Sequence, residues 1–342
     1  MKVVKTLQLA FEQIREMITG AVRIWEEDGL LRMSRFTEEQ ENLYKTVSEA
    51  FYMKSLASAG MRLMFRTNSR SLTLKLVTAP GSTRTFVSYD VFVNGAPAGY
   101  LSNYTEPMPE DYIPAQYPMG EISGTVALGE GEKTVCVYMP WSASTAIREM
   151  SLEDGAFSAP AKPEKLLLAY GDSITQGYDA PRPSQRYVSQ LADFLGAAEL
   201  NKAIGAEIFR PELAELSDPV TPDYISVAYG TNDWGKVDAE TFRKNCRAFY
   251  ETLSIRYPQT RIFALTPICR VDFRQERSVG TFDRVEAIIR ETVADLNNVT
   301  VIRCFDFVPE DANCFSDRYL HPNAQGFAHY GENLCAAVAR IL

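Results

Sequence analysis

The chain has 342 residues, 46% of them hydrophobic, so it can bury a large core and is long enough for two domains, because single cores stop growing at about 250–300 residues. Its formal net charge is −9 and its 35 basic residues are dispersed, which excludes the basic footprint of a nucleic-acid or anionic-membrane binder. No apolar run approaches the ~18 residues of a membrane helix, and residues 1–10 lack a signal-peptide core, so we expect a cytoplasmic protein.

The first sixty residues combine helical and hairpin patterns. A hairpin is predicted across residues 22–34, because Asp28-Gly29 is a favoured two-residue turn. Thr37-Glu-Glu-Gln40 is a capping box and predicts a short helix that runs towards Phe51. Before these, apolar residues at helical spacing predict a helix that ends at Gly20; they are Leu7, Phe11, Ile14 and Ile18.

From Gly60 onward the apolar residues alternate with a period of two. The alternating runs occupy residues 62–65, 72–76, 87–93, 120–128 and 134–138, and Asn94-Gly95 is a strong hairpin signal. Short strands without intervening helices predict an antiparallel, jelly-roll-like β-sandwich. We therefore expect an N-terminal domain over residues 1–154, followed by a linker rich in Gly, Ala, Ser and Pro over residues 155–164.

After the linker, strand and helix patterns alternate. Strands are predicted at residues 166–170, 224–229, 261–265 and 299–304, and helices at residues 187–195, 239–257, 279–296 and 324–341. This alternation predicts an α/β domain over residues 165–342, a three-layer doubly wound fold with a parallel sheet. In such sheets, sites form beyond the carboxyl ends of the strands.

Three segments of this domain place polar residues where a site would form. Ser173 follows the first strand in K-L-L-L-A-Y-G-D-S-I-T, Asn232 follows a later strand in G-T-N-D, and Asp317 and His321 precede the last helix in D-R-Y-L-H-P-N. Each has a structural alternative, because serine can cap a helix, asparagine can close a turn and a lone histidine is usually structural. The other histidine, His329, is eight residues on, which is no metal-ligand spacing, so we expect no metal.

Together these residues supply what acyl transfer needs: a hydroxyl nucleophile, an amide donor for an oxyanion and an acid–base pair. An imidazole has an ordinary pKa near 6.5, so His321 can take the proton of Ser173 as the hydroxyl attacks an ester carbonyl. Asp317 would hold the imidazole tautomer. Asp172 and Asp233, beside these residues, are expected to fix their loops by accepting backbone hydrogen bonds.

The blocks G-D-S-I-T, G-T-N-D and H-P-N, in this order, resemble the motifs of the SGNH/GDSL hydrolases over residues 166–342. The resemblance implies a serine esterase without a cofactor, and an oxyanion hole made by Ser173, Asn232 and a glycine after the second strand. Gly205 is the candidate, although N-K-A-I-G departs from the usual run. The preceding β-rich segment resembles two-domain microbial carbohydrate esterases, which implies a small-molecule or oligosaccharide acyl ester, acetyl foremost, as substrate.

Several alternatives stay open at this point. Asp317 stands four residues before His321, where the family usually has three, so Asp311 or a Ser–His dyad competes with it; a helical turn would still bring Asp317 to the imidazole. An acyltransferase, thioesterase or lipase, or an inactive carbohydrate-binding protein, competes with the esterase. The candidates for the mouth of the substrate site are Tyr178, Arg186 and Trp234. The sequence leaves the oligomeric state open.

Overall fold

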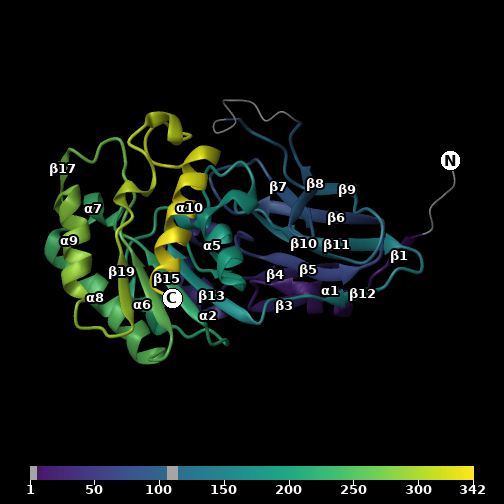
Figure 1. Ribbon diagram of the computed structural model, residues 1–342, viewed down its shortest axis with the longest axis horizontal. Helices are drawn as coiled ribbons and strands as arrows, with labels where there is room; N and C mark the ends of the chain where they lie inside the picture. Colours follow the sequence, from purple (N-terminus) through teal and green to yellow (C-terminus); the bar gives the residue numbers. More distant parts are fainter. Residues whose placement is uncertain (1–5, 106–114) are drawn as a thin grey trace.

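The computed structural model describes residues 6–105 and 115–342 and contains an antiparallel β domain and an α/β domain packed side by side (Figure 1). Residues 1–5 and 106–114 of the expected N-terminal domain lie outside the described residues. Within the described ranges, no helix combines the length and the apolarity needed to span a bilayer.

Two antiparallel sheets make up the N-terminal domain as far as its residues are described. The first has the order β3 (Arg23–Glu27), β4 (Leu30–Ser34), β11 (Ala143–Glu153), β6 (Ser71–Pro80) and β9 (Glu121–Ala127), with β1 (Thr6–Gln8) against β11. The second has the order β12 (Ser158–Pro160), β5 (Arg62–Thr67), β10 (Lys133–Tyr138), β7 (Ser88–Val93) and β8 (Ala96–Ser102), with β2 (Ile18–Thr19) against β5. Buried side chains of both sheets, such as Leu74 and Phe65, share one core, which confirms the antiparallel β-rich domain; the jelly-roll winding stays a prediction.

In the described part of this domain, three short helices accompany the sheets: α1 (Phe11–Met17), α2 (Glu38–Val47) and α3 (Glu49–Ser55). The predicted capping box is present, because the Thr37 hydroxyl accepts a hydrogen bond from the Gln40 backbone at the start of α2. The first helix is shorter than predicted, since Leu7 and Ile18 pair with neighbouring strands instead. The predicted linker is also partly wrong, because β12 lies within residues 155–164 and pairs with β5.

The C-terminal domain is built on a five-stranded parallel sheet with the order β14 (Ala197–Asn201), β13 (Lys165–Gly171), β15 (Tyr224–Ala228), β16 (Arg261–Leu265) and β19 (Val299–Ile302). Leu167 and Leu168 are neighbours on β13 but belong to separate buried clusters, so the sheet is covered on both faces. One cluster includes α5 (Tyr187–Leu195) and α10 (Ala324–Ala339); the other includes α6 (Pro211–Glu215), α8 (Ala239–Arg256) and α9 (Phe282–Thr292). This arrangement confirms the predicted α/β fold with a parallel sheet.

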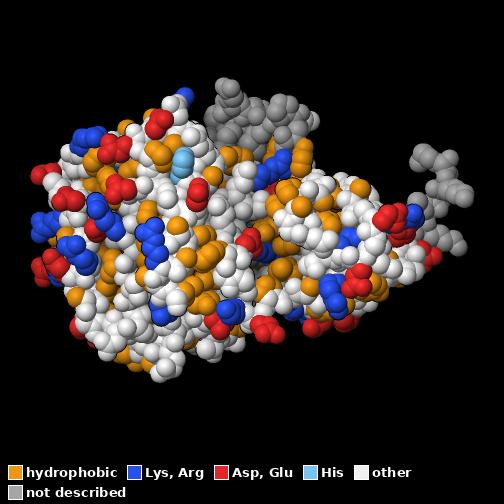
Figure 2. Space-filling view, in the orientation of Figure 1, with side chains coloured by type: hydrophobic (Ala, Val, Ile, Leu, Met, Phe, Trp, Pro, Cys, Tyr) orange, Lys and Arg blue, Asp and Glu red, His pale blue; other side chains and the backbone are white. Residues whose placement is uncertain are grey.

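The remaining elements of this domain are short. They are α4 (Ser173–Gln176), α7 (Asp233–Lys236), the 3-10 turns η1 (Pro183–Gln185), η2 (Phe305–Phe307) and η3 (Ala312–Cys314), and the hairpin of β17 (Glu276–Arg277) and β18 (Gly280–Thr281). Because β13 and β15 are adjacent and parallel, α4 and α7 begin at the same edge of the sheet. On the face shown in Figure 2, acidic and basic side chains are interspersed over the α/β domain.

Candidate active site

Ser173 opens α4 directly after β13, and its side chain is almost fully buried. The preceding Asp172 caps this helix, because its carboxylate accepts a hydrogen bond from the Ile174 backbone at 2.9 Å. Gly171 is required for the sharp turn, since a Cβ there would lie 2.1 Å from the hydroxyl oxygen of Thr175. The strand therefore presents the Ser173 hydroxyl at the carboxyl edge of the sheet.

His321 lies between Ser173 and Asp317. Its Nδ1 donates to a carboxylate oxygen of Asp317 at 2.7 Å, and its Nε2 lies 2.9 Å from the Ser173 hydroxyl oxygen. With the Nδ1 proton held by Asp317, Nε2 is the nitrogen that can accept the serine proton. The structure thus brings together the three side chains for which the sequence predicts catalytic roles.

The turn before α10 places Asp317 at the imidazole. One carboxylate oxygen of Asp317 accepts the backbone N–H groups of Tyr319 at 2.9 Å, Leu320 at 2.7 Å and His321 at 3.1 Å, while the other meets Nδ1. Partial burial alone would raise the pKa of Asp317, but hydrogen bonds from the His321 side chain and the Leu320 backbone outweigh it and lower the pKa to about 2. The carboxylate is therefore ionised at neutral pH.

This turn is not the helical turn that the sequence predicts. Phe315 and Pro322 form an isolated antiparallel bridge, and Arg318 adopts a left-handed backbone with φ of 59°. Asp311, the alternative acid, caps η3 by accepting two hydrogen bonds from Asn313, and none of the described hydrogen bonds joins it to His321.

Gly205 is not placed to donate to an oxyanion, because its backbone N–H already donates to the Gln176 side chain at 2.8 Å. The neighbouring Ala206 has φ of 71°, and its N–H has no acceptor among the described hydrogen bonds. Ala206 is therefore an alternative candidate for the donor that the sequence analysis assigns to Gly205. No local pattern in the sequence shows that the Gln176 side chain accepts the Gly205 N–H.

Asn232 follows β15 as expected and donates one N–H of its side-chain amide to the Glu207 carbonyl at 3.0 Å. This bond joins the end of β15 to the loop that contains Ala206. Asp233 also connects these two segments, since its carboxylate accepts the backbone N–H groups of Phe209 and Gly230, each at 3.0 Å. The expectation that Asp172 and Asp233 fix their loops is confirmed.

The N-terminal domain also holds this loop. The buried guanidinium of Arg35 donates from one nitrogen to the Asn201 carbonyl at 2.7 Å and the Ala203 carbonyl at 2.8 Å. Lys54 donates to the Gly205 carbonyl at 2.8 Å. The backbone around the candidate oxyanion donor is therefore supported from both domains.

Two of the three candidates for the substrate mouth are buried structural residues. Arg186 is 1% exposed and forms a bidentate ion pair with Glu199. Trp234 is fully buried, donates to the Gly280 carbonyl and packs against Phe282. Both predictions are wrong, because a polar or aromatic residue near a motif can equally face the interior.

Tyr178 lies beside the imidazole instead of at an open mouth. It is 5% exposed, and its ring stacks on His321 with ring centroids 5.6 Å apart. Trp141 of the N-terminal domain packs against Tyr178 and donates to the Ala180 carbonyl at 2.9 Å. Tyr178 is thus placed to restrain the imidazole.

Asp179 is a site residue that sequence reasoning missed. Its buried carboxylate lies 3.7 Å from Nδ1 of His321 and forms an ion pair with Arg84 of the N-terminal domain. The donor atoms of Asp179, Asp317 and His321 lie within 4.8 Å of one another, close enough to hold a cation. Because Arg84 already neutralises Asp179 and Nδ1 is bonded to Asp317, we assign no metal ligand here.

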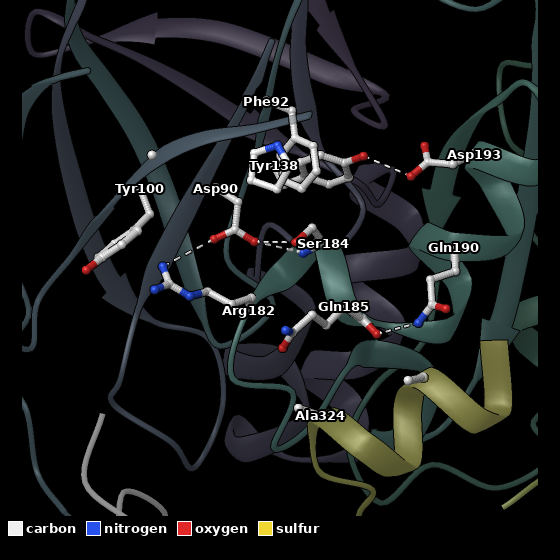
Figure 3. A pocket seen from close by; sticks show the side chains of 13 residues that line it. Asp90, Phe92, Tyr100, Tyr138, Arg182, Ser184, Gln185, Gln190, Asp193 and Ala324 are labelled. Atoms are coloured by element: carbon white, nitrogen blue, oxygen red, sulfur yellow. Dashed lines mark hydrogen bonds and ion pairs between the residues drawn. The ribbon is translucent and has the colours of Figure 1, made fainter. Parts of the chain in front are cut away.

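A groove of about 670 Å³ lies between the two domains (Figure 3). Its lining includes Tyr100 and Tyr138 from the β domain, with Arg182, Ser184 and Asp193 from the α/β domain. Ser173, Asp317 and His321 are not among its lining residues. Figure 3 shows that many of the polar groups pair across the interface, as Tyr138 does by donating to Asp193 at 2.8 Å.

Comparisons with known proteins agree with this fold. Residues 169–329 match the model of the GDSL-like lipase/acylhydrolase family. No curated protein matches the chain. Solved structures of low identity share the fold along the whole chain.

Three of these structures illustrate the similarity. A salicylyl-acyltransferase, SsfX3 from a tetracycline biosynthetic pathway, has TM-score 0.79 and 21% identity over 98% of this chain and 97% of its own. A putative GDSL-like lipase from Bacteroides ovatus has TM-score 0.74 and 19% identity over 98% of both chains. A family two carbohydrate esterase from Cellvibrio japonicus has TM-score 0.66 and 18% identity, also over 98% of both chains. The arrangement of a β domain before the α/β domain is therefore shared.

Proposed function

Since residues 169–329 are a GDSL-like lipase/acylhydrolase domain and the protein is an ester-hydrolysing enzyme, we propose that it removes short acyl groups, acetyl foremost, from a carbohydrate. The observation that carries the catalytic assignment is the pair of distances at His321: 2.9 Å to the Ser173 hydroxyl and 2.7 Å to the Asp317 carboxylate. These are hydrogen-bonding distances for a nucleophile, its base and the acid that orients the base.

In the acylation step, Ser173 attacks the ester carbonyl while Nε2 of His321 takes its proton. The oxyanion of the tetrahedral intermediate accepts hydrogen bonds from the backbone N–H groups of Ser173 and Ala206 and from the second amide N–H of Asn232. His321 then protonates the leaving alcohol. Water, deprotonated by the same imidazole, hydrolyses the acyl-enzyme and regenerates Ser173.

The preference for a short acyl group is supported by the segment after the nucleophile. Residues 179–186 are polar and rich in proline, and within them Asp179 and Arg186 are buried in ion pairs. They form no apolar insertion that could cover a long chain. The preference for a carbohydrate is supported by the two-domain arrangement shared with the carbohydrate esterase from Cellvibrio japonicus.

An acyltransferase is the second candidate, and the fold shared with the salicylyl-acyltransferase favours it. The two activities use the same acyl-enzyme on Ser173 and differ in whether water or another alcohol takes the acyl group. The ratio of transfer product to free acid, measured with rising concentrations of a sugar alcohol, separates them. A product that is mainly the new ester at millimolar acceptor would replace the hydrolase with the transferase.

The test of the proposed function is a panel of p-nitrophenyl esters from acetate to octanoate, together with peracetylated xylose and glucose. The wild type and Ser173→Ala are compared on each ester. We expect kcat/KM to be highest for acetate, and acetate release from the sugars to require Ser173. Higher kcat/KM on octanoate would favour a lipase, and sugar binding without any turnover would favour an inactive binding protein.

A further inference from the structure

A second carboxylate faces the imidazole of His321. Asp179 is fully buried, and its nearer oxygen lies 3.7 Å from Nδ1, beyond the 2.7 Å of Asp317. The same oxygen accepts a hydrogen bond from the Ser316 hydroxyl at 2.7 Å. Ser316 precedes Asp317 in the turn, so Asp179 touches the segment that carries the orienting acid.

The backbone of Asp179 is left-handed, with φ of 68°, a conformation that is costly for residues other than glycine. Hydrogen bonds from the N-terminal domain surround this position. Trp141 donates to the next residue's carbonyl, and the Thr83 backbone donates to the Tyr178 hydroxyl at 3.4 Å. The carboxylate is therefore held beside His321 by contacts from another domain.

Arg84 supplies the charge that balances Asp179. Its Nε donates to one carboxylate oxygen at 2.7 Å and its Nη2 to the other at 3.2 Å, which is the bidentate geometry of a strong ion pair. Burial alone would lower the pKa of Arg84, but the hydrogen bonds and charge of Asp179 outweigh it and raise the pKa. Arg84 lies between β6 and β7, so the cation comes from the N-terminal domain.

Within residues 6–105 and 115–342, few charged groups lie around His321. Asp317 bonds to Nδ1, Asp179 lies behind it and is paired with Arg84, and the buried Asp172 acts on the imidazole through space. Tyr178 covers one ring face with an uncharged phenol ring. A negative charge within about 4–6 Å favours an imidazolium, and a positive charge disfavours it. Asp179 and Arg84 thus push the proton affinity of His321 in opposite directions.

We propose that Asp179 is a positioning residue whose charge, moderated by Arg84 of the N-terminal domain, sets the basicity of His321. The proposal deepens the proposed function, because it rests on His321 as the general base of ester hydrolysis. It makes the N-terminal domain part of the catalytic unit through one ion pair, in addition to any role in substrate binding.

The first test measures kcat/KM for p-nitrophenyl acetate against pH. Asp179→Asn should move the acid limb of the profile to lower pH by about one unit, with little change in KM, because an anion that favours the imidazolium is removed. Arg84→Gln should move the limb to higher pH, because the anion is no longer balanced. Arg84→Lys keeps the positive charge but loses the bidentate hydrogen bonds to Asp179. It should therefore move the acid limb much less than Arg84→Gln does.

The matched control is Asp193→Asn. Asp193 also joins the two domains, by an ion pair with Arg62 and a hydrogen bond from Tyr138, but none of its described contacts is with His321. This variant should leave the acid limb in place. If Asp179→Asn lowers kcat equally at every pH, or if Asp193→Asn moves the limb as far as Asp179→Asn does, the role of Asp179 is only structural and the proposal is overturned.

A second measurement does not depend on turnover. The chain has two histidines, so NMR can follow the titration of His321 with His329 as internal reference. In folded Asp179→Asn, the midpoint of His321 should fall by about one unit while that of His329 stays in place. In Arg84→Gln it should rise. Unchanged midpoints for His321 in both variants would overturn the proposal, whereas absence of esterase activity in the wild type would overturn the proposed function alone.

Discussion

Nδ1 of His321 lies 2.7 Å from a carboxylate oxygen of Asp317, four positions earlier in the chain, because the intervening backbone folds into a tight turn around the other oxygen of the same carboxylate. An extended segment would turn residues an even number apart to one face but would carry them about 13 Å apart. The left-handed Arg318 bends the chain back and removes that separation. The turn, and not the spacing alone, pairs the acid with the base.

If Asp317 orients the imidazole, Asp317→Asn should lower kcat on an acetyl ester by on the order of 10⁴, because the amide favours the wrong tautomer. Asp311→Asn is the matched control, since Asp311 lies in the preceding loop and caps η3. The kcat of Asp311→Asn on the same acetyl ester should stay within about threefold of the wild-type kcat. Retention of more than about a tenth of kcat by Asp317→Asn, with His321→Ala inactive, would leave a Ser–His dyad.

Ser173→Ala should abolish turnover while preserving the fold. The hydroxyl contributes one hydrogen bond at the sheet edge, so the free energy of unfolding should change by about 1 kcal/mol or less. Steady-state kinetics on p-nitrophenyl acetate and thermal unfolding check the two parts. Ester hydrolysis within tenfold of the wild type would show that another residue is the nucleophile.

Asn232→Ala should lower kcat by roughly 10²–10³ with little change in KM, because an oxyanion donor acts mainly in the transition state. The variant also loses the bond to the Glu207 carbonyl, so its melting temperature must be measured beside its kinetics. Asn232→Asp, which keeps the shape but has no side-chain N–H, should show a loss of kcat at least as large. A defect expressed mainly in KM would make Asn232 a substrate-binding residue.

Two buried carboxyl groups should make stability depend on pH. Burial raises the pKa of Asp233 to about 7 and that of Asp172 to about 6, against an ordinary value near 3.9. At a pH between the ordinary value and the raised pKa, each carboxyl group is still protonated in the folded state but has lost its proton in the unfolded state. Their contribution to stability is therefore complete below about pH 4 and is lost as the pH rises through about 6 to 7.

Between pH 4 and pH 7.5, the free energy of unfolding should fall by about 1–3 kcal/mol less in Asp233→Asn than in the wild type. This difference does not depend on how the substitution changes the absolute stability. Chemical denaturation at several pH values measures the difference. The surface variant Asp154→Asn is a control for one lost charge, because Asp154 is exposed and takes part in none of the described hydrogen bonds or ion pairs. An Asp233→Asn profile parallel to that of the wild type would show that this carboxyl group is ionised at a lower pH.

The sequence by itself determined the order of elements and the positions of Ser173, Asn232 and His321 at the edge of the α/β domain. These are local properties, because apolar periodicity, glycine turns and helix caps act over a few residues. The apolar run before Gly171 predicts a buried strand, and that strand is β13. The hairpin at Asn94-Gly95 and the helix from Tyr187 to Leu195 are likewise present.

Only the tertiary structure decided which polar groups meet. Arg84 and Asp179 come from different domains and lie 95 positions apart, and no local pattern pairs them. The Gly205 N–H donates to the side chain of Gln176, and the buried Arg186 forms an ion pair with Glu199. Each outcome depends on desolvation: a buried charge or amide must find a partner, and packing between distant segments determines which partner is within reach.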